Sequence, residues 1–246
     1  MSGKVAMVTG ASSGIGAATA RRLAAAGYRV IAVARRLDRL EKLAAEIGGE
    51  ARRVDVTDPS SVAELAAATE RLDLLVNNAG GALGIDPIEA SDDEGWRVMW
   101  ETNVLGLMRV TRALLPALRA SGAGHVINVG SVSGFEVYPG GAGYTSVKHA
   151  ARAITQTLRI ELLGEPIRIT EINPGMVETE FALVRLGGDE SRAATTYKGM
   201  TPLTGDDVAA CIVWAATRPP HVNIDELVVR PLDQASVGHV HRRPPD

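Results

Sequence analysis

A tyrosine and a lysine stand four residues apart, at Tyr144 and Lys148. On a helix this spacing places both side chains on one face. A neighbouring ammonium favours the phenolate and lowers the tyrosine pKa from about 10. Such a pair could donate and accept a proton near neutral pH, as a general acid/base does. Because this spacing also occurs by chance, the hypothesis depends on other residues of the chain.

Two polar residues are candidates to complete the site. Ser131 follows a predicted strand at residues 125–129, at the carboxyl edge of the sheet, where ligands of α/β proteins bind. Its hydroxyl could hold a carbonyl oxygen beside Tyr144. Asn103 lies in an apolar helical stretch, where helix propensity gives asparagine no advantage. A solvent-facing polar residue is the alternative for Asn103.

Residues 9–16 form a glycine-rich segment between the first predicted strand and the first predicted helix. Glycines there let the backbone approach a pyrophosphate, and the helix N-terminus offers free N–H groups and a positive dipole end. An ordinary glycine-rich turn is the alternative. The candidate residues of this dinucleotide-binding loop are Gly10, Ser12, Ser13, Gly14, Ile15 and Gly16.

The end of the second predicted strand indicates which dinucleotide binds. An NAD-binding protein places a carboxylate there for the ribose 2′-hydroxyl, whereas this chain has Arg35 and Arg36. Guanidinium groups pair with a 2′-phosphate, so we expect NADP(H). Two arginines that open a solvated helix are the alternative. After the third strand, Asp55 could accept from an adenine amino group and Val56 could offer its backbone N–H, although a turn aspartate explains Asp55 equally well.

Residues 179–201 fall between the sixth strand and the last helix, where long loops often act as lids. Arg185 in this segment has apolar neighbours, so it could bind a substrate carboxylate. A surface arginine with a buried stem is the alternative. Phe135, Tyr138 and Met176 are the candidate walls of the substrate pocket.

The elements that must position these residues alternate along the chain. Predicted strands (residues 5–9, 29–34, 52–56, 72–76, 125–129, 167–172 and 226–229) alternate with predicted helices (15–26, 37–47, 59–69, 92–119 with an interruption near Pro116, 144–163 and one after Thr204). This order predicts an α/β fold, a doubly wound seven-stranded parallel sheet with helices on both faces. No linker divides the chain, so residues 1–246 are expected to form one Rossmann-fold domain with a flexible tail from about residue 236.

The predicted helix at residues 92–119 is apolar almost all round, although a helix that covers a sheet needs only one apolar face. The surplus predicts a subunit interface, with a deeper core as the alternative.

Composition narrows the class of protein. The 246 residues are 46% apolar, carry a net charge of −3 and include one cysteine, Cys211. This balance argues against nucleic-acid and anionic-membrane binding. A lone cysteine excludes an internal disulfide, and no leader or membrane-spanning run is visible, so a cytoplasmic protein is expected. The five histidines show no metal-site spacing, and no metal is expected.

Four features of the chain together resemble the short-chain dehydrogenase/reductase family. They are the glycine loop, the segment 77–80, the polar residues Asn103, Ser131, Tyr144 and Lys148, and the turn at 173–175. This resemblance spans nearly the whole chain. It implies a Rossmann fold and hydride transfer at the nicotinamide. It also implies that Ser131 orients the substrate oxygen, that Tyr144 is the acid/base, that Lys148 binds the nicotinamide ribose and lowers the Tyr144 pKa, and that Asn103 anchors a water.

The family resemblance further implies which residues line the cofactor besides Tyr144 and Lys148: Asn77, Ala79, Gly80, Pro174, Gly175, Val177 and Thr179. The stretches 181–185, 196–198, 220–224 and 230–234 are similar to the NADP-dependent 3-hydroxy acid dehydrogenases, a group that includes serine and allo-threonine dehydrogenases and is typically tetrameric. We therefore expect a homotetramer that acts on a small-molecule hydroxy or carbonyl substrate, with Ser131 and Tyr144 contacting it. The alternatives are a reductase of a larger carbonyl in secondary metabolism and a non-catalytic NADP-binding sensor.

Overall fold

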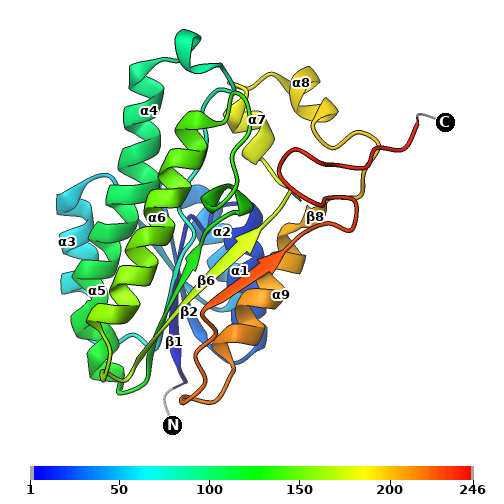
Figure 1. The fold of residues 1–246 in the computed structure, drawn as a ribbon. Coiled ribbons are helices and arrows are strands. Elements are labelled where there is room, and N and C mark those ends of the chain that lie inside the picture. Colours follow the sequence, from blue (N-terminus) through cyan, green and yellow to red (C-terminus); the bar gives the residue numbers. More distant parts are fainter. Residues whose placement is uncertain (1–2, 245–246) are drawn as a thin grey trace.

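The computed structural model describes residues 3–244 and shows one parallel sheet at the centre of the molecule (Figure 1). Its seven strands run in the order β3-β2-β1-β4-β5-β6-β9. Their bounds are β1 Val5–Thr9, β2 Arg29–Ala34, β3 Glu50–Arg53, β4 Leu74–Asn77, β5 Gly124–Val129, β6 Ile167–Pro174 and β9 Glu226–Val229. The direction of the strand order reverses between β1 and β4, which is where ligands of doubly wound sheets bind.

Helices cover both faces of this sheet (Figure 1). On one face pack α1 Gly14–Ala25, α2 Leu37–Ile47 and α9 Gly205–Ala216, and on the other pack α3 Pro59–Ala67, α5 Leu107–Ser121 and α6 Ala142–Glu161. Helix α4 Asp93–Trp100 packs against α6. The single doubly wound α/β domain predicted from the sequence is therefore confirmed.

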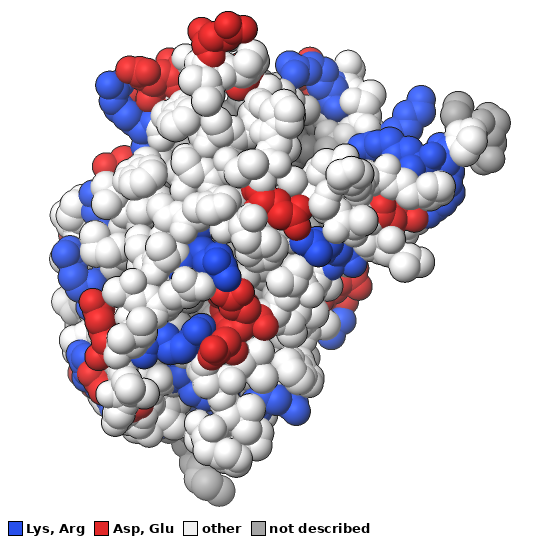
Figure 2. Space-filling view, viewed as in Figure 1, with Lys and Arg blue, Asp and Glu red and all other residues white. Residues whose placement is uncertain are grey.

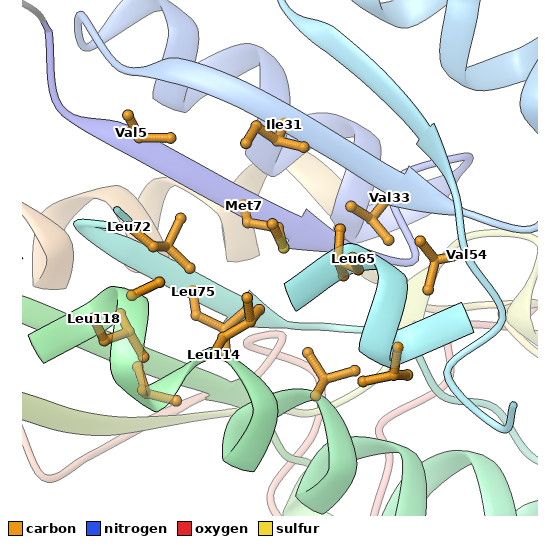
Figure 3. Close-up of a cluster of buried hydrophobic side chains, with 14 of the residues drawn as sticks. Val5, Met7, Ile31, Val33, Val54, Leu65, Leu72, Leu75, Leu114 and Leu118 are labelled. Carbon is orange, nitrogen blue, oxygen red and sulfur yellow. The ribbon is translucent and has the colours of Figure 1, made fainter. Parts of the chain in front are cut away.

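The residues of β1 show why both faces are covered. Val5 and Met7 point into the cluster of Figure 3, where Leu114 of α5 also packs, while Ala6 and Val8 pack into the cluster under α1, α2 and α9. Successive side chains of a strand point to opposite faces. A strand that is buried at every position thus holds together two hydrophobic layers.

The predicted helix over residues 92–119 is divided, but not at the predicted place. Pro116 lies inside α5, and the change comes at a π-helical segment, Glu101–Gly106, between α4 and α5. The side-chain amide of Asn103 donates to the carbonyl oxygen of Met99 at 2.8 Å. In an α-helix this carbonyl accepts from the backbone four residues on, so the side chain competes with the regular ladder.

The segment between β6 and α9 contains β7 Val177–Glu178, α7 Phe181–Arg185, α8 Glu190–Thr195 and β8 Leu203–Thr204, and β7 pairs with β8. Two short 3₁₀ helices, Ile88–Ala90 and Val132–Gly134, lie in the connections that follow β4 and β5. The predicted flexible tail differs from the structure, because residues 239–243 bond to ordered parts of the chain. The backbone N–H of Arg243 donates to Gly199 at 2.7 Å, and that of His241 donates to Asp233 at 2.8 Å. Residues 245 and 246 lie outside the described range.

The surface carries charges of both signs. In Figure 2, lysine and arginine side chains are interspersed with aspartate and glutamate, and uncharged residues cover most of this face. Within residues 3–244 no helix is long and apolar enough to span a bilayer, and no three His, Cys, Asp or Glu side chains form a potential metal site.

A buried histidine gives the fold a predictable response to acid. His125 of β5 is 2% exposed, and its Nε2 lies 2.8 Å from the hydroxyl of Thr170. Burial lowers its pKa from 6.5 to about 3, with a smaller contribution from Arg168. The unfolded chain therefore binds more protons than the folded chain between these values, and stability falls as the pH drops below 6.5.

Protonation of His125 in the unfolded chain should lower the free energy of unfolding by about 2 kcal/mol between about pH 7 and pH 5. Urea unfolding at several pH values should show that His125→Gln loses stability less steeply with acid than the unmodified protein. The exposed His221→Gln control should keep the original slope. Parallel slopes for His125→Gln and the unmodified protein would contradict the prediction.

Candidate active site

A cleft of ≈ 630 Å³ opens at the carboxyl ends of the strands. It is lined by most of the predicted site residues, namely Gly10, Ser12, Ser13, Gly14, Ile15, Arg35, Arg36, Asp55, Val56, Ala79, Gly80, Ser131, Tyr138, Tyr144, Lys148, Pro174, Gly175, Met176, Val177, Thr179 and Arg185. The sheet thus brings the predicted cofactor end (the glycine loop, Arg35 and Arg36) and the predicted chemistry end (Ser131, Tyr144 and Lys148) into one continuous cleft. Gly16, Asn77, Asn103 and Phe135 are not among the lining residues.

The glycine loop closes tightly against the start of α1. Gly10 and Gly14 have φ angles of 65° and 52°, in the left-handed region that side chains disfavour. A Cβ at Gly16 would lie 2.4 Å from the carbonyl oxygen of Gly10. Ser13 precedes the helix without a side-chain cap, so the first N–H groups of α1 remain available to an anion. The loop thus fits a pyrophosphate, and Gly16 serves close packing rather than contact.

Asn77 does not line the cofactor cleft, which corrects the expectation from the family resemblance. It is 5% exposed, and its amide donates to the hydroxyl of Thr111 and to the side-chain oxygen of Asn128, both at 2.9 Å. These bonds join β4 to α5 and β5. The neighbouring Asn78 lines the cleft instead and donates to the carbonyl oxygen of Thr9 at 2.9 Å.

At the end of β2, Arg36 spans the glycine loop. Its guanidinium donates to the hydroxyls of Ser12 and Ser13 at 2.9 and 2.8 Å, and to the carboxylate of Glu180 at 3.0 Å. Arg39 donates to the same carboxylate at 2.7 Å. Sequence reasoning did not find Glu180 or Arg39, because no local pattern signals a pairing between residues 144 positions apart.

Asp55 acts as a turn aspartate, which is the alternative interpretation given above. One oxygen of its carboxylate accepts from the backbone N–H and the hydroxyl of Thr57, at 3.0 and 2.8 Å. Asp55 also lines the cleft beside Val56. The turn contact therefore orients the carboxylate without removing it from the cofactor end.

Helix α6 carries Tyr144 and Lys148 on one face, as predicted. The Lys148 ammonium lies 5.8 Å from the Tyr144 ring centroid and donates to the carbonyl oxygen of Val129 at 3.0 Å. Burial lowers the pKa of Lys148 to about 8, while the charge of Glu171 raises it. The lysine is thus held at the end of β5 by a strand carbonyl.

The electrostatics of Tyr144 differ from the expectation. Burial raises the pKa of Tyr144, and the opposing contributions come from the Ser131 hydroxyl and the Arg185 guanidinium, not from Lys148. The cause is that burial penalises the phenolate and that Lys148 bonds to a backbone carbonyl.

Ser131 is positioned from beneath by β6. Its backbone N–H donates to the side-chain oxygen of Asn173 at 2.9 Å, and the Asn173 amide donates to Glu171 at 3.2 Å. Glu171 is 1% exposed, and burial raises its pKa. Arg152 lies 3.9 Å from its carboxylate. Sequence reasoning missed Glu171, and a carboxylate inside a strand expected to be buried was the available signal.

Asn103 fastens the loop beside the cleft to the π-helical segment. Its amide donates to the carbonyl oxygen of Gly81 at 2.9 Å, and its side-chain oxygen accepts from the Gly81 N–H at 3.2 Å. A Cβ at Gly80 would lie 2.6 Å from that oxygen, which explains a glycine there. The solvent-facing alternative for Asn103 is excluded, since the residue is 3% exposed.

Arg185 of α7 lies above the chemistry end of the cleft. It donates to the hydroxyl of Tyr138 and the carbonyl oxygen of Gly84, both at 2.9 Å. Its guanidinium carbon lies 5.6 Å from the centroid of the Tyr144 ring. Its Nη2 is buried and has no hydrogen-bond partner among residues 3–244. A partly buried guanidinium whose Nη2 donor is free is suited to an anionic ligand.

An aromatic residue other than the predicted Phe135 lines the cleft beside Tyr144. Phe135 was predicted to be a pocket wall, but its ring packs 5.4 Å from the guanidinium of Arg152 and does not line the cleft. Phe181 of α7 lines the cleft instead, and its ring meets that of Tyr144 edge-on at a centroid distance of 5.4 Å. Phe135 follows the 3₁₀ helix Val132–Gly134 and packs against Arg152, so it does not have the predicted role of a pocket wall.

Comparison with known proteins agrees with this arrangement. Residues 4–185 match the family model described as short chain dehydrogenase. The chain belongs to the short-chain dehydrogenase family and is an oxidoreductase of the class that uses a nicotinamide cofactor.

Three similar proteins show how far the likeness extends. An uncharacterised oxidoreductase of Mycobacterium tuberculosis is 59% identical, over 96% of this chain and 94% of that protein. Serine 3-dehydrogenase of Agrobacterium fabrum is 42% identical, over 97% of each chain. A solved closed form of serine dehydrogenase in complex with NADP+ superposes with a TM-score of 0.92 at 39% identity, over 97% of this chain and 100% of that one.

Proposed function

We propose that this protein is an NADP(H)-dependent dehydrogenase that interconverts a small 3-hydroxy acid and the corresponding carbonyl compound. The observation that carries this substrate class is Arg185, which lies beside Tyr144 and whose buried Nη2 has no hydrogen-bond partner in the described part of the chain. A carboxylate two carbons from the reacting carbon would supply that partner. The likeness to serine 3-dehydrogenase and to NADP+-bound serine dehydrogenase supports both the substrate class and the cofactor.

The residues at the chemistry end have distinct roles in this proposal. The bound nicotinamide supplies the hydride donor or acceptor. Ser131 holds the substrate oxygen, and Tyr144 donates a proton to it during reduction or accepts one during oxidation. Lys148 holds the nicotinamide ribose and places a positive charge on the same side of the cleft. Asn103, whose amide already binds Gly81 and Met99, keeps the Gly80-Gly81 loop in place. Its predicted anchoring of a water stays a proposal.

The arginines after β2 account for the choice of NADP(H) over NAD(H). Arg36 extends its guanidinium over the glycine loop, and both Arg35 and Arg36 line the cleft. No carboxylate stands directly at the end of β2, where it would repel a phosphate. We assign the ribose 2′-phosphate to these two residues.

The substrate class can be tested at Arg185. In Arg185→Ala we expect KM for a 3-hydroxy acid to rise about 10- to 100-fold, the effect of losing one charge-assisted pair. A neutral aldehyde of the same length should show a much smaller change, because it has no carboxylate. Steady-state kinetics with both substrates measure this difference.

Arg192 offers a matched control for this experiment, since it is an exposed arginine of the same segment, in α8. Arg192→Ala should leave both substrates unaffected. Unchanged KM and kcat for the 3-hydroxy acid in Arg185→Ala would contradict the carboxylate assignment.

We also propose that the protein is a homotetramer in the cytoplasm. Part of the apolar surplus of residues 92–119 packs into the core, but Val98 and Trp100 are 43% and 41% exposed. On α6 and just beyond it, Ile160 and Leu163 are 75% and 87% exposed. Exposed apolar residues on adjoining helices are typical of a subunit interface. The cytoplasmic assignment rests on the single free cysteine.

A further inference from the structure

Glu180 connects the segment above the substrate to the cofactor end. This residue directly precedes α7, and its two carboxylate oxygens bind Arg36 at 3.0 Å and Arg39 at 2.7 Å. Hydrogen bonds from Arg39 and Arg36 lower the pKa of Glu180, so the carboxylate is charged at neutral pH. Glu180, near the start of the segment 179–201, is thus tied to the N-terminal end of α2.

The guanidinium that holds Glu180 is the one assigned above to the 2′-phosphate. Arg36 donates to Ser12, Ser13 and Glu180 at once, so four of its five N–H groups are engaged before any ligand arrives. A phosphate dianion and the Glu180 carboxylate would repel each other if both bound this guanidinium. The two anions therefore compete for Arg36.

The same contact also holds α7. Beyond Glu180, this helix places Phe181 against the Tyr144 ring and Arg185 over it. Releasing Glu180 from Arg36 would leave the N-terminal end of α7 held to α2 only through Arg39. Binding of a 2′-phosphate is thereby coupled to the position of the segment that covers the substrate.

We propose that Glu180 is an internal competitor of the NADP(H) 2′-phosphate for Arg36. Glu180 must release Arg36 when the cofactor binds, and it helps to displace the phosphate when the cofactor leaves. The inference rests on the proposed NADP(H) dependence. Its consequence is that Glu180 weakens the affinity for NADP(H) and leaves that for NAD(H) unchanged, because only the phosphorylated cofactor needs Arg36 free.

The effect should be modest, because the three side chains are each 42% exposed and solvent screens their attraction. A ligand whose site is partly occupied loses affinity in proportion to that occupancy. We expect Glu180→Gln to bind NADPH about 3- to 10-fold more tightly than the unmodified protein. Affinity for NADH should change less than about 2-fold, since its ribose carries no phosphate.

Equilibrium titrations of NADPH, NADH and adenosine 2′,5′-bisphosphate, followed by calorimetry, test the proposal without turnover. The bisphosphate carries the 2′-phosphate but no nicotinamide, so its affinity should rise with that of NADPH. Glu178→Gln is the matched control, since Glu178 is an exposed carboxylate of β7 and does not line the cleft. It should leave all three affinities as they are.

Three results would overturn the proposal. The first is an NADPH affinity that is unchanged or weaker in Glu180→Gln, and the second is an equal gain in the NADH affinity of that variant. The third is an equal gain in the NADPH affinity of Glu178→Gln, which would indicate only a long-range charge effect. The proposed NADP(H) dependence has a separate test, because it is wrong if the unmodified protein does not bind NADPH more tightly than NADH. An unmodified protein that prefers NADPH, with no gain in Glu180→Gln, refutes the internal competitor alone.

Discussion

Replacing Tyr144 by phenylalanine should lower kcat at least about 1,000-fold, within the range that general acid/base catalysis contributes. The substitution removes only the hydroxyl. The ring can still meet Phe181 at 5.4 Å and Arg185 at 5.6 Å, so the cleft should keep its shape. The dissociation constant of NADPH should therefore stay within about 2-fold of that of the unmodified protein, because the proton donor acts on the substrate. Turnover assays and NADPH titration by fluorescence measure the two quantities.

Tyr138→Phe is the matched control for this experiment. It also removes one tyrosine hydroxyl from the cleft, but this hydroxyl accepts from Arg185. We expect Tyr138→Phe to change KM for the acid substrate while kcat keeps its order of magnitude. Substantial turnover in Tyr144→Phe would refute the proposed mechanism, and equal losses in both variants would show that Tyr144 has no special role.

The second large effect is expected at the cofactor arginines. In the double variant Arg35→Ser with Arg36→Ser, the dissociation constant of NADPH should rise about 100-fold or more, since charge-assisted bonds to a phosphate contribute about 1.5–3 kcal/mol each. The dissociation constant of NADH should change less than about 3-fold, because its ribose has no phosphate for these residues to bind. Titration with both cofactors gives the ratio directly.

Arg97→Ala controls for the loss of positive charge, because Arg97 is an exposed residue of α4 that does not line the cleft. It should leave both dissociation constants unchanged. An equal loss of NADPH and NADH affinity in the double variant would mean that the arginines support the loop as a whole. In that case the 2′-phosphate assignment would be wrong.

The parts of the site that could be predicted from sequence are those encoded locally. The spacing of Tyr144 and Lys148 places them on one helix face, and the glycine loop follows directly from its position between β1 and α1. Strand β1 is apolar from Val5 to Val8 and buried at every position, as expected of a strand covered on both faces. In these cases neighbours in the chain determine the outcome.

The parts that failed depend on residues far apart in the chain. Asn77 and Asn78 are adjacent, and only the positions of Thr111 and Asn128 determine that the first is buried in a bonded network. The orientation of Phe135 depends on Arg152, and the break after α4 depends on the loop that Asn103 binds. Similarly, a four-residue spacing cannot show that Val129 holds the Lys148 ammonium and that burial raises the pKa of Tyr144.

The most direct measurement is the reduction of NADP+ by the purified protein with L-serine, 3-hydroxypropionate and matched alcohols that lack the carboxylate, followed by the appearance of NADPH. The proposed function predicts turnover with at least one 3-hydroxy acid, a preference over the matched alcohol, and little turnover with NAD+. Binding of NADP+ without turnover of any hydroxy acid, or of any carbonyl compound in the reverse direction, would contradict it.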